Sequence, residues 1–190
     1  MLAVILTGGR SSRMGRDKAM LPVGGVPMAQ LLAERFRASG FDVAVSVDRA
    51  GRFPLDGVLE MEDAFPGEGP LNGLYSAFTK TQENAVFFTA TDLPGGDPEL
   101  AKKLFDLRGD SDACLIRRAD GRAETLFGVY ARSSLPAVSE CLKEGRRAVR
   151  AALESLRVRW VEERELPEWE LSRVLRNVNT PEEYAALETE

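Results

Sequence analysis

Histidine is absent from the 190 residues of this sequence. That absence excludes Ser-His-Asp and Cys-His catalysis, the HExxH zinc motif and acid–base chemistry on an imidazole. Any reaction that the chain catalyses must therefore use carboxylates, lysine, arginine, a metal ion or the charge of its own substrate.

Long apolar runs are also missing. The N-terminal run, residues 1–6, ends at Thr7 and Gly8 and has no basic segment before it, so it is too short for a signal peptide or a membrane span. Cys114 and Cys141 have no metal-ligand spacing, which favours reduced and mostly buried thiols. We therefore expect a cytoplasmic protein that does not associate with membranes.

Positive charge is in short supply overall, because the formal net charge is −5. This balance argues against non-specific binding to nucleic acid, and an anionic ligand would need a local basic patch. The length and the 44% hydrophobic content suit one globular domain over residues 1–190, and they leave too little chain for two.

Predicted strands and helices alternate along the chain. The apolar patterns predict strands at 2–6, 43–47, 58–61, 85–89, 113–116, 127–130 and 158–161. Helices are predicted at 27–39, 71–81, 135–144 and 147–156, after the Asp97-Pro98 cap and after the Thr180-Pro181 capping box. This alternation indicates an α/β fold with a mostly parallel sheet covered on both faces. Ligands of such sheets bind beyond the carboxyl ends of the strands.

The loop after the first strand, residues 7–18, has the chemistry of a phosphate-binding site. Gly8 and Gly9 allow the backbone to approach an oxyanion closely. Four cations follow within nine residues: Arg10, Arg13, Arg16 and Lys18. The spacing is neither a Walker A motif nor GxGxxG. A solvated surface turn is the alternative, but the position after the first strand favours phosphate binding.

Asp92 follows the apolar run at 86–90, so we expect it at the tip of a buried strand on the same edge as the glycine-rich loop. A carboxylate beside phosphates is the usual ligand of Mg²⁺, which takes its remaining ligands from phosphate and water. Asp92 could instead be an ordinary turn residue before Leu93-Pro94. The shared edge favours metal binding.

Three further polar residues are less specific. Asp63 has the properties of a solvated acid among Glu60, Glu62 and Glu68. Asn177 and Asn179 are spaced to lie on one side of an extended segment, where amides could face a heterocycle. Turn and cap chemistry before the last helix is the alternative for these two asparagines.

Together these segments resemble the molybdenum cofactor guanylyltransferase family within the nucleotidyltransferase superfamily. The resemblance spans nearly the whole chain and rests on LTGGRSSRMGRDKAMLPVGGVPM at 6–28, GPLNGLYSAF at 69–78, ATDLP at 90–94, LFGVY at 126–130 and RNVNTPEEY at 176–184. The first and last segments are the most specific. The resemblance implies a Rossmann-like three-layer α/β sandwich with a mostly parallel central sheet, of the nucleotide-diphospho-sugar transferase type.

The resemblance also implies GTP and molybdopterin as substrates, Mg²⁺ as cofactor, and a set of site residues. The nucleotide would contact residues of the first loop together with two aspartates: Leu6, Thr7, Gly8, Gly9, Lys18, Asp63 and Asp92. The expected catalytic residues are Arg13, Lys18 and Asp92, of which Asp92 would bind the metal. The pterin would contact Arg13, Asn177 and Asn179. Cofactor-delivery proteins and apo-molybdoenzymes are possible partners.

The chain departs from the family pattern at three positions. Thr7 replaces the usual Ala, Thr125 replaces the Pro usual before Leu-Phe-Gly, and Ser46, expected just after the strand of Val43 and Val45, stands where Asn is common. None of these changes affects Lys18 or Asp92.

The implied reaction joins molybdopterin to GMP. The phosphate of molybdopterin would attack the α-phosphorus of GTP, form molybdopterin guanine dinucleotide and release pyrophosphate. Three alternatives remain open: a cytidylyltransferase or sugar-phosphate nucleotidyltransferase of the same fold, a non-catalytic carrier of GTP or pterin, and an α/β domain without a ligand at this edge.

Overall fold

The computed structural model of the chain describes residues 1–7, 18–23, 25–53, 55, 57–65, 67, 69–178 and 183. Its strands are β1 (Leu2–Leu6), β2 (Pro22–Val23), β3 (Val26–Pro27), β4 (Asp42–Val47), β5 (Leu59–Glu62), β6 (Ala85–Ala90), β7 (Ala113–Arg117), β8 (Ala123–Ala131) and β9 (Val158–Glu162). Its α-helices are α1 (Met28–Ala38), α2 (Pro70–Lys80), α3 (Pro98–Arg108), α4 (Leu135–Lys143), α5 (Val149–Ala152) and α6 (Leu171–Val174). Four 3-10 turns join them: η1 (Lys18–Met20), η2 (Arg132–Ser134), η3 (Leu153–Ser155) and η4 (Glu163–Glu165).

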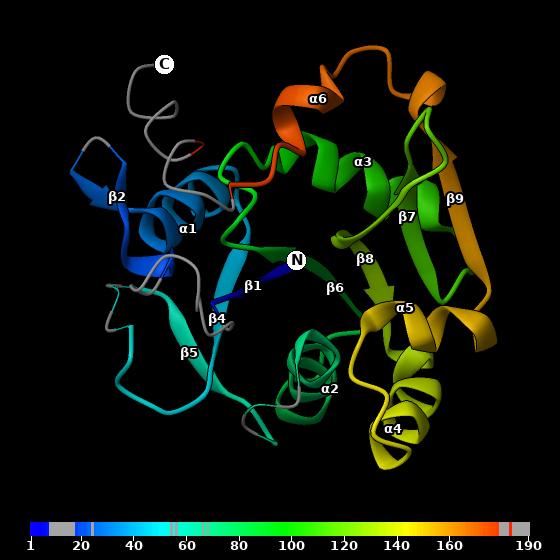
Figure 1. Ribbon diagram of the computed structural model, residues 1–190, viewed down its shortest axis with the longest axis horizontal. Helices are drawn as coiled ribbons and strands as arrows, with labels where there is room; N and C mark the ends of the chain where they lie inside the picture. The colour runs from blue at the N-terminus through cyan, green and yellow to red at the C-terminus, as the bar shows by residue number, and fades with distance from the viewer. Residues whose placement is uncertain are drawn as a thin grey trace.

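Seven of the described strands form one sheet in the order β5-β4-β1-β6-β8-β7-β9 (Figure 1). β1 pairs in parallel with β4 and β6, and β4 pairs in parallel with β5. Within this sheet β8 alone runs antiparallel, because a turn at Asp120 and Gly121 folds it back directly onto β7. The expectation of a mostly parallel sheet is confirmed.

The helices cover both faces of the sheet, so the molecule has three layers (Figure 1). Side chains of β1 alternate between two cores: Ala3 and Ile5 face one core, and Leu2, Val4 and Leu6 face the other. Residues of α1, α3 and α6 complete the first core, whereas residues of α2, α4 and α5 complete the second. Both faces are therefore buried, as the continuous apolar strands predict.

Some predicted elements differ in extent from the observed ones. The predicted helix at 147–156 is shortened to α5 and η3, because the Arg147 carbonyl accepts a hydrogen bond from Leu71 N of α2 at 3.2 Å. The strand predicted at 127–130 begins earlier, at Ala123, and continues past a register shift opposite Leu115 and Ile116. The charged stretch 162–173, whose order is not predictable from its poor periodicity, contains η4 and the start of α6.

Two predicted helix starts have different outcomes. The Asp97 carboxylate accepts hydrogen bonds from Glu99 N at 2.7 Å and Leu100 N at 3.0 Å, so the predicted cap of α3 is confirmed. The predicted start of the last helix at Thr180 lies outside the described residues.

Candidate active site at the carboxyl ends of the strands

Hydrogen bonding between the parallel strands continues one residue beyond their carboxyl ends. Thr7 N donates to Ser46 O at 3.3 Å, Thr91 N donates to Leu6 O at 3.1 Å, and Asp63 N donates to Val47 O at 2.7 Å. The segments that follow β5, β1 and β6 are therefore fixed to one edge of the sheet. The prediction that the first loop and Asp92 begin on the same edge is confirmed.

A chain of hydroxyl hydrogen bonds connects Thr7 to Asp63. Thr7 Oγ1 donates to Ser46 O at 2.5 Å, and Ser46 Oγ donates to Asp63 Oδ1. Ser46 lies within β4, in agreement with the strand predicted at 43–47, so its placement just after the strand of Val43 and Val45 is wrong. Its hydroxyl is bonded to the Asp63 carboxylate.

Asp63 is a partly buried carboxyl group, unlike the solvated acid that its acidic neighbours indicate. Burial raises its pKa above the ordinary value, while the hydrogen bond from Ser46 and the nearby amide of Asn72 oppose that rise. Asp48 raises the pKa further and Lys80 lowers it. The polar contacts of Asp63 therefore favour the carboxylate form at a site that is otherwise unfavourable to charge.

The first turn of α2 lies against these residues. A Cβ at Gly73 would come within 2.5 Å of Leu6 Cδ2 and 3.1 Å of Ser46 Oγ, so only glycine permits this approach without displacement. Asn72 and Ser76, on the same side of α2, bond to the backbone that follows Asp63. We did not predict a site role for either residue. The available signal was a polar pair at i and i+4 within the mostly apolar stretch 71–78.

Asp92 lies in the turn after β6 and is partly buried. Its carbonyl oxygen accepts a hydrogen bond from Val178 N at 2.9 Å, which brings the C-terminal segment to this edge of the sheet. Asn177, one residue earlier, is exposed. Backbone hydrogen bonds at the strand ends thus hold together the segments that carry Leu6, Thr7, Asp63 and Asp92. The bond from Val178 N adds the segment that carries Asn177.

The acidic groups at this edge fit a metal ion that arrives with phosphate ligands. Within the described part of the chain, no group of three or more His, Cys, Asp or Glu side chains could hold a metal by itself. Asp92 offers one carboxylate, and a divalent cation bound beside phosphates commonly takes one or two protein carboxylates and completes its shell with phosphate and water.

A pocket of about 810 Å³ lies beside Asn177. Its wall includes Trp160, over whose ring the Arg117 guanidinium lies at 4.5 Å. The charged groups of the wall balance one another: Arg117, Arg122 and Arg150 against Asp120, Glu124 and Glu154. Such a surface offers donors, acceptors and one aromatic face to the same ligand.

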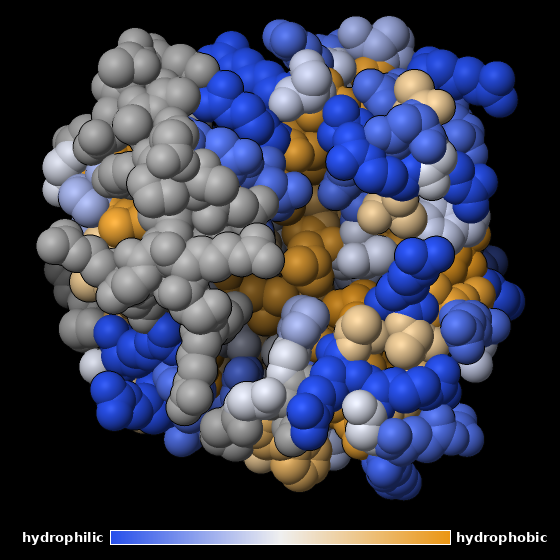
Figure 2. Space-filling model, in the orientation of Figure 1, coloured by the Kyte–Doolittle hydropathy of each residue, from blue (hydrophilic) through white to orange (hydrophobic). Residues whose placement is uncertain are grey.

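A hollow with hydrophobic side chains at its base opens in the middle of one face of the molecule, over β1, β6 and β8 (Figures 1 and 2). Hydrophilic side chains border it on the side of α3 and α5. An apolar base within a polar border is typical of small-molecule sites.

Several predicted site residues lie outside the described part of the chain: Gly8, Gly9, Arg13 and Asn179. Lys18 begins η1, which packs against α1, but its side chain is also outside the description. The roles expected of these five residues stay predictions.

The structure defines an α/β protein with a mostly parallel sheet and polar groups at the carboxyl ends of its strands, and comparisons with known proteins agree with this fold. The chain belongs to the MobA-like NTP transferase domain family, whose model matches residues 3–186. A probable molybdenum cofactor guanylyltransferase of Carboxydothermus hydrogenoformans is 30% identical, over 98% of this chain and 94% of the relative.

Solved structures share the fold. Molybdopterin-guanine dinucleotide biosynthesis protein A of Archaeoglobus fulgidus superposes with a TM-score of 0.85 at 21% identity, covering 100% of this chain and 97% of that one. A protein of Mycobacterium tuberculosis H37Rv, solved in complex with manganese, has a TM-score of 0.65 at 19% identity, covering 100% of this chain and 97% of that one. Among the described residues, no helix is both long and apolar enough to cross a membrane.

Gly95→Ala tests how the C-terminal segment is held at this edge. A Cβ at Gly95 would lie 2.6 Å from the carbonyl oxygen of Arg173 and 3.2 Å from that of Val174, so backbone has to move. We expect the hydrogen bond from Val178 N to Asp92 O to weaken and the Val178 amide to exchange its hydrogen at least tenfold faster. Hydrogen exchange followed by NMR measures this rate. An unchanged rate at Val178 would contradict the assignment.

Proposed function

We propose that this chain transfers GMP from GTP to the phosphate of molybdopterin, forming molybdopterin guanine dinucleotide and releasing pyrophosphate. One observation carries the proposal: Leu6, Thr7, Asp63 and Asp92 meet at one edge of a sheet in a chain of the MobA-like family. Relatives named as molybdenum cofactor guanylyltransferases match nearly its full length.

In this proposal GTP lies along the strand ends. The backbone of Leu6, Thr7, Gly8 and Gly9 contacts the nucleotide, and Asp63 contacts its guanosine. Lys18 and Arg13 neutralise the phosphates. The 3.1 Å bond from Thr91 to Leu6 supports the arrangement, because it holds the start of the first loop beside the turn that carries Asp92.

The nucleophile needs no strong base. A phosphate monoester has its second pKa near ~6, so it is mostly dianionic at neutral pH and can attack the α-phosphorus directly. The chain's contribution is to position the two substrates and to neutralise charge. This division of work suits a protein without histidine.

Asp92 is the residue that would hold a divalent metal, and we propose Mg²⁺. The bound ion would supply charge neutralisation at the triphosphate. The manganese complex of the Mycobacterium tuberculosis protein supports a divalent metal in this fold. Asp92 then serves to orient the phosphates against the acceptor.

The acceptor is proposed to lie on the side of Asn177, with Asn179 and Arg13 completing its contacts. The 810 Å³ pocket at Asn177 supports this placement, because a pterin has both donors and acceptors on its edge and a flat ring. The bond from Val178 to Asp92 O links that pocket to the proposed metal site.

A cytoplasmic location and exchange of the product with cofactor-delivery proteins or apo-molybdoenzymes complete the proposal. Cys114 and Cys141 are both buried and unbonded, and burial raises the pKa of the Cys114 thiol to about 12, which agrees with a reducing compartment.

Pyrophosphate release with each of the four ribonucleoside triphosphates tests the function. With molybdopterin and Mg²⁺ present, we expect release from GTP and little from CTP, UTP or ATP. No release without molybdopterin serves as the control. Preference for CTP would instead assign a cytidylyltransferase, and binding of GTP without any release would assign a non-catalytic carrier.

Asp92→Ala tests the metal role. We expect turnover to fall by about 10²-fold or more, because one charge-stabilising contact of the transition state is lost. Asp106→Ala, which removes an exposed carboxylate on α3, is the matched control and should leave turnover unchanged. A near-normal rate of Asp92→Ala with normal dependence on Mg²⁺ would refute the assignment.

Asn177→Ala tests the acceptor side. Loss of one hydrogen bond is worth about 1 kcal/mol, so KM for molybdopterin should rise roughly five- to tenfold while the Kd of GTP stays constant. Asn84→Ala, an exposed asparagine before β6, controls for the substitution. Steady-state kinetics and calorimetry separate the two effects. A change in GTP binding alone would place Asn177 on the nucleotide side.

A further inference from the structure

Asn72 is a fully buried amide in the first turn of α2. Its Oδ1 accepts a hydrogen bond from Phe65 N at 3.2 Å. Its Nδ2 makes no hydrogen bond within the described part of the chain. The amide nevertheless lies close enough to Asp63 to lower the pKa of that carboxyl group. A buried amide donor without a full partner is costly, so its position requires an explanation.

The carboxyl group of Asp63 lies between two donors. Ser46 Oγ of β4 donates to Oδ1, and the Asn72 amide of α2 makes no hydrogen bond to this carboxyl group but lies near enough to lower its pKa. Two donors from different elements restrict the rotation of a carboxylate more than one does. They also leave its remaining lone pairs available to a ligand.

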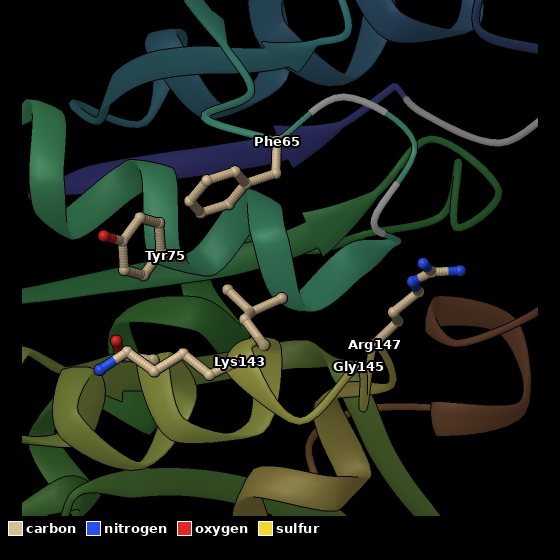
Figure 3. A pocket seen from close by; sticks show the side chains of 7 residues that line it. Phe65, Tyr75, Lys143, Gly145 and Arg147 are labelled. Atoms are coloured by element: carbon tan, nitrogen blue, oxygen red, sulfur yellow. The ribbon is translucent and has the colours of Figure 1, made fainter.

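The segment that carries Asp63 is attached to α2 at two successive residues. Ala64 N donates to Ser76 Oγ at 2.9 Å, and Ser76 Oγ donates to Asn72 O at 2.8 Å. The Phe65 ring lies 5.6 Å from that of Tyr75, and the two rings lie close together on one wall of a groove between α2 and α4 (Figure 3). Asn72 therefore has two neighbours in this segment: its Oδ1 bonds to the backbone at Phe65, and its amide lies near the Asp63 carboxylate.

We propose that Asn72 is a positioning residue that sets base selectivity by holding Asp63 in the orientation that accepts two hydrogen bonds from guanine. Guanine carries two adjacent donors, N1–H and the exocyclic amino group, and a carboxylate accepts both at once. Hypoxanthine retains only N1–H, and adenine presents an acceptor at N1. The inference rests on the proposed function, since it concerns the nucleotide of that site.

The isosteric variant Asn72→Asp separates the two roles of the amide. It keeps an oxygen for Phe65 N and so preserves the attachment of the segment, but it removes the donor toward Asp63 and adds repulsion. Ser46→Ala removes the donor on the other side and does not alter α2. Thr79→Ala is the control, because the Thr79 hydroxyl bonds to Tyr75 O within the same helix.

Calorimetry of GTP and ITP binding tests the selectivity without an acceptor. We expect Asn72→Asp to weaken GTP binding about tenfold and to change ITP binding less, so that the ratio of the two Kd values moves toward one. The two ligands carry the same triphosphate, so the added charge affects both equally. Ser46→Ala should move the ratio in the same direction, and Thr79→Ala should leave it unchanged. An unchanged ratio in both site variants would overturn the proposal.

An NMR titration of the Asp63 carboxyl carbon supplies a readout that needs no nucleotide. Protonation of Asp63 removes its acceptor, so GTP affinity should fall as pH drops through the Asp63 pKa. Ser46, Asn72 and Lys80 lower the pKa of Asp63, and Asp48 raises it. Because each site variant removes a group that lowers this pKa, the loss of GTP affinity should occur at a higher pH in both variants. A wild-type titration curve in both would refute the role of Asn72. Selective GTP binding without pyrophosphate release would refute only the proposed reaction.

Discussion

The hydrogen bonds that continue past the ends of the parallel strands are the constraint on which the candidate site depends. Thr7, Asp63 and Thr91 each donate a backbone N–H to the neighbouring strand after their own strand has ended. Because parallel strands point their carboxyl ends the same way, these residues come together from segments more than 80 positions apart. The site geometry is thus a consequence of strand register.

Close packing of α2 completes that geometry. Gly73 allows the first turn of the helix to lie against Leu6 and Ser46, and the same approach brings Asn72 beside Asp63. On the other side, Gly95 allows the segment at Arg173 and Val174 to pass over the turn of Asp92. Two glycines therefore permit the close approaches that bring α2 and the C-terminal segment to this edge of the sheet.

The sequence predicts the parts of the site that depend on local pattern. Apolar runs ending in polar residues place Thr7 and Asp92 correctly, because strand direction and burial follow from such runs. The environment of Asp63 is not predictable in this way. Its acidic neighbours in the sequence indicate a solvent-exposed side chain. In the structure it is a partly buried carboxylate beside Ser46 and Asn72, which are 17 and 9 residues away in the sequence. The late start of the helix predicted at 147–156 likewise depends on a hydrogen bond from α2 to Arg147 O.

The absence of histidine and the partial burial of Asp63 both suit the ligands that we propose, a nucleotide and a phosphate monoester. In the proposed reaction between phosphates, the nucleophile is already charged at neutral pH, so the chain would need no group that titrates near pH 7. It needs acceptors and cations that keep their charge. The donors around Asp63 oppose the rise in its pKa that burial causes. A carboxylate held in that way recognises a base edge with little reorganisation, which is the contribution that positioning, as distinct from proton transfer, makes to catalysis.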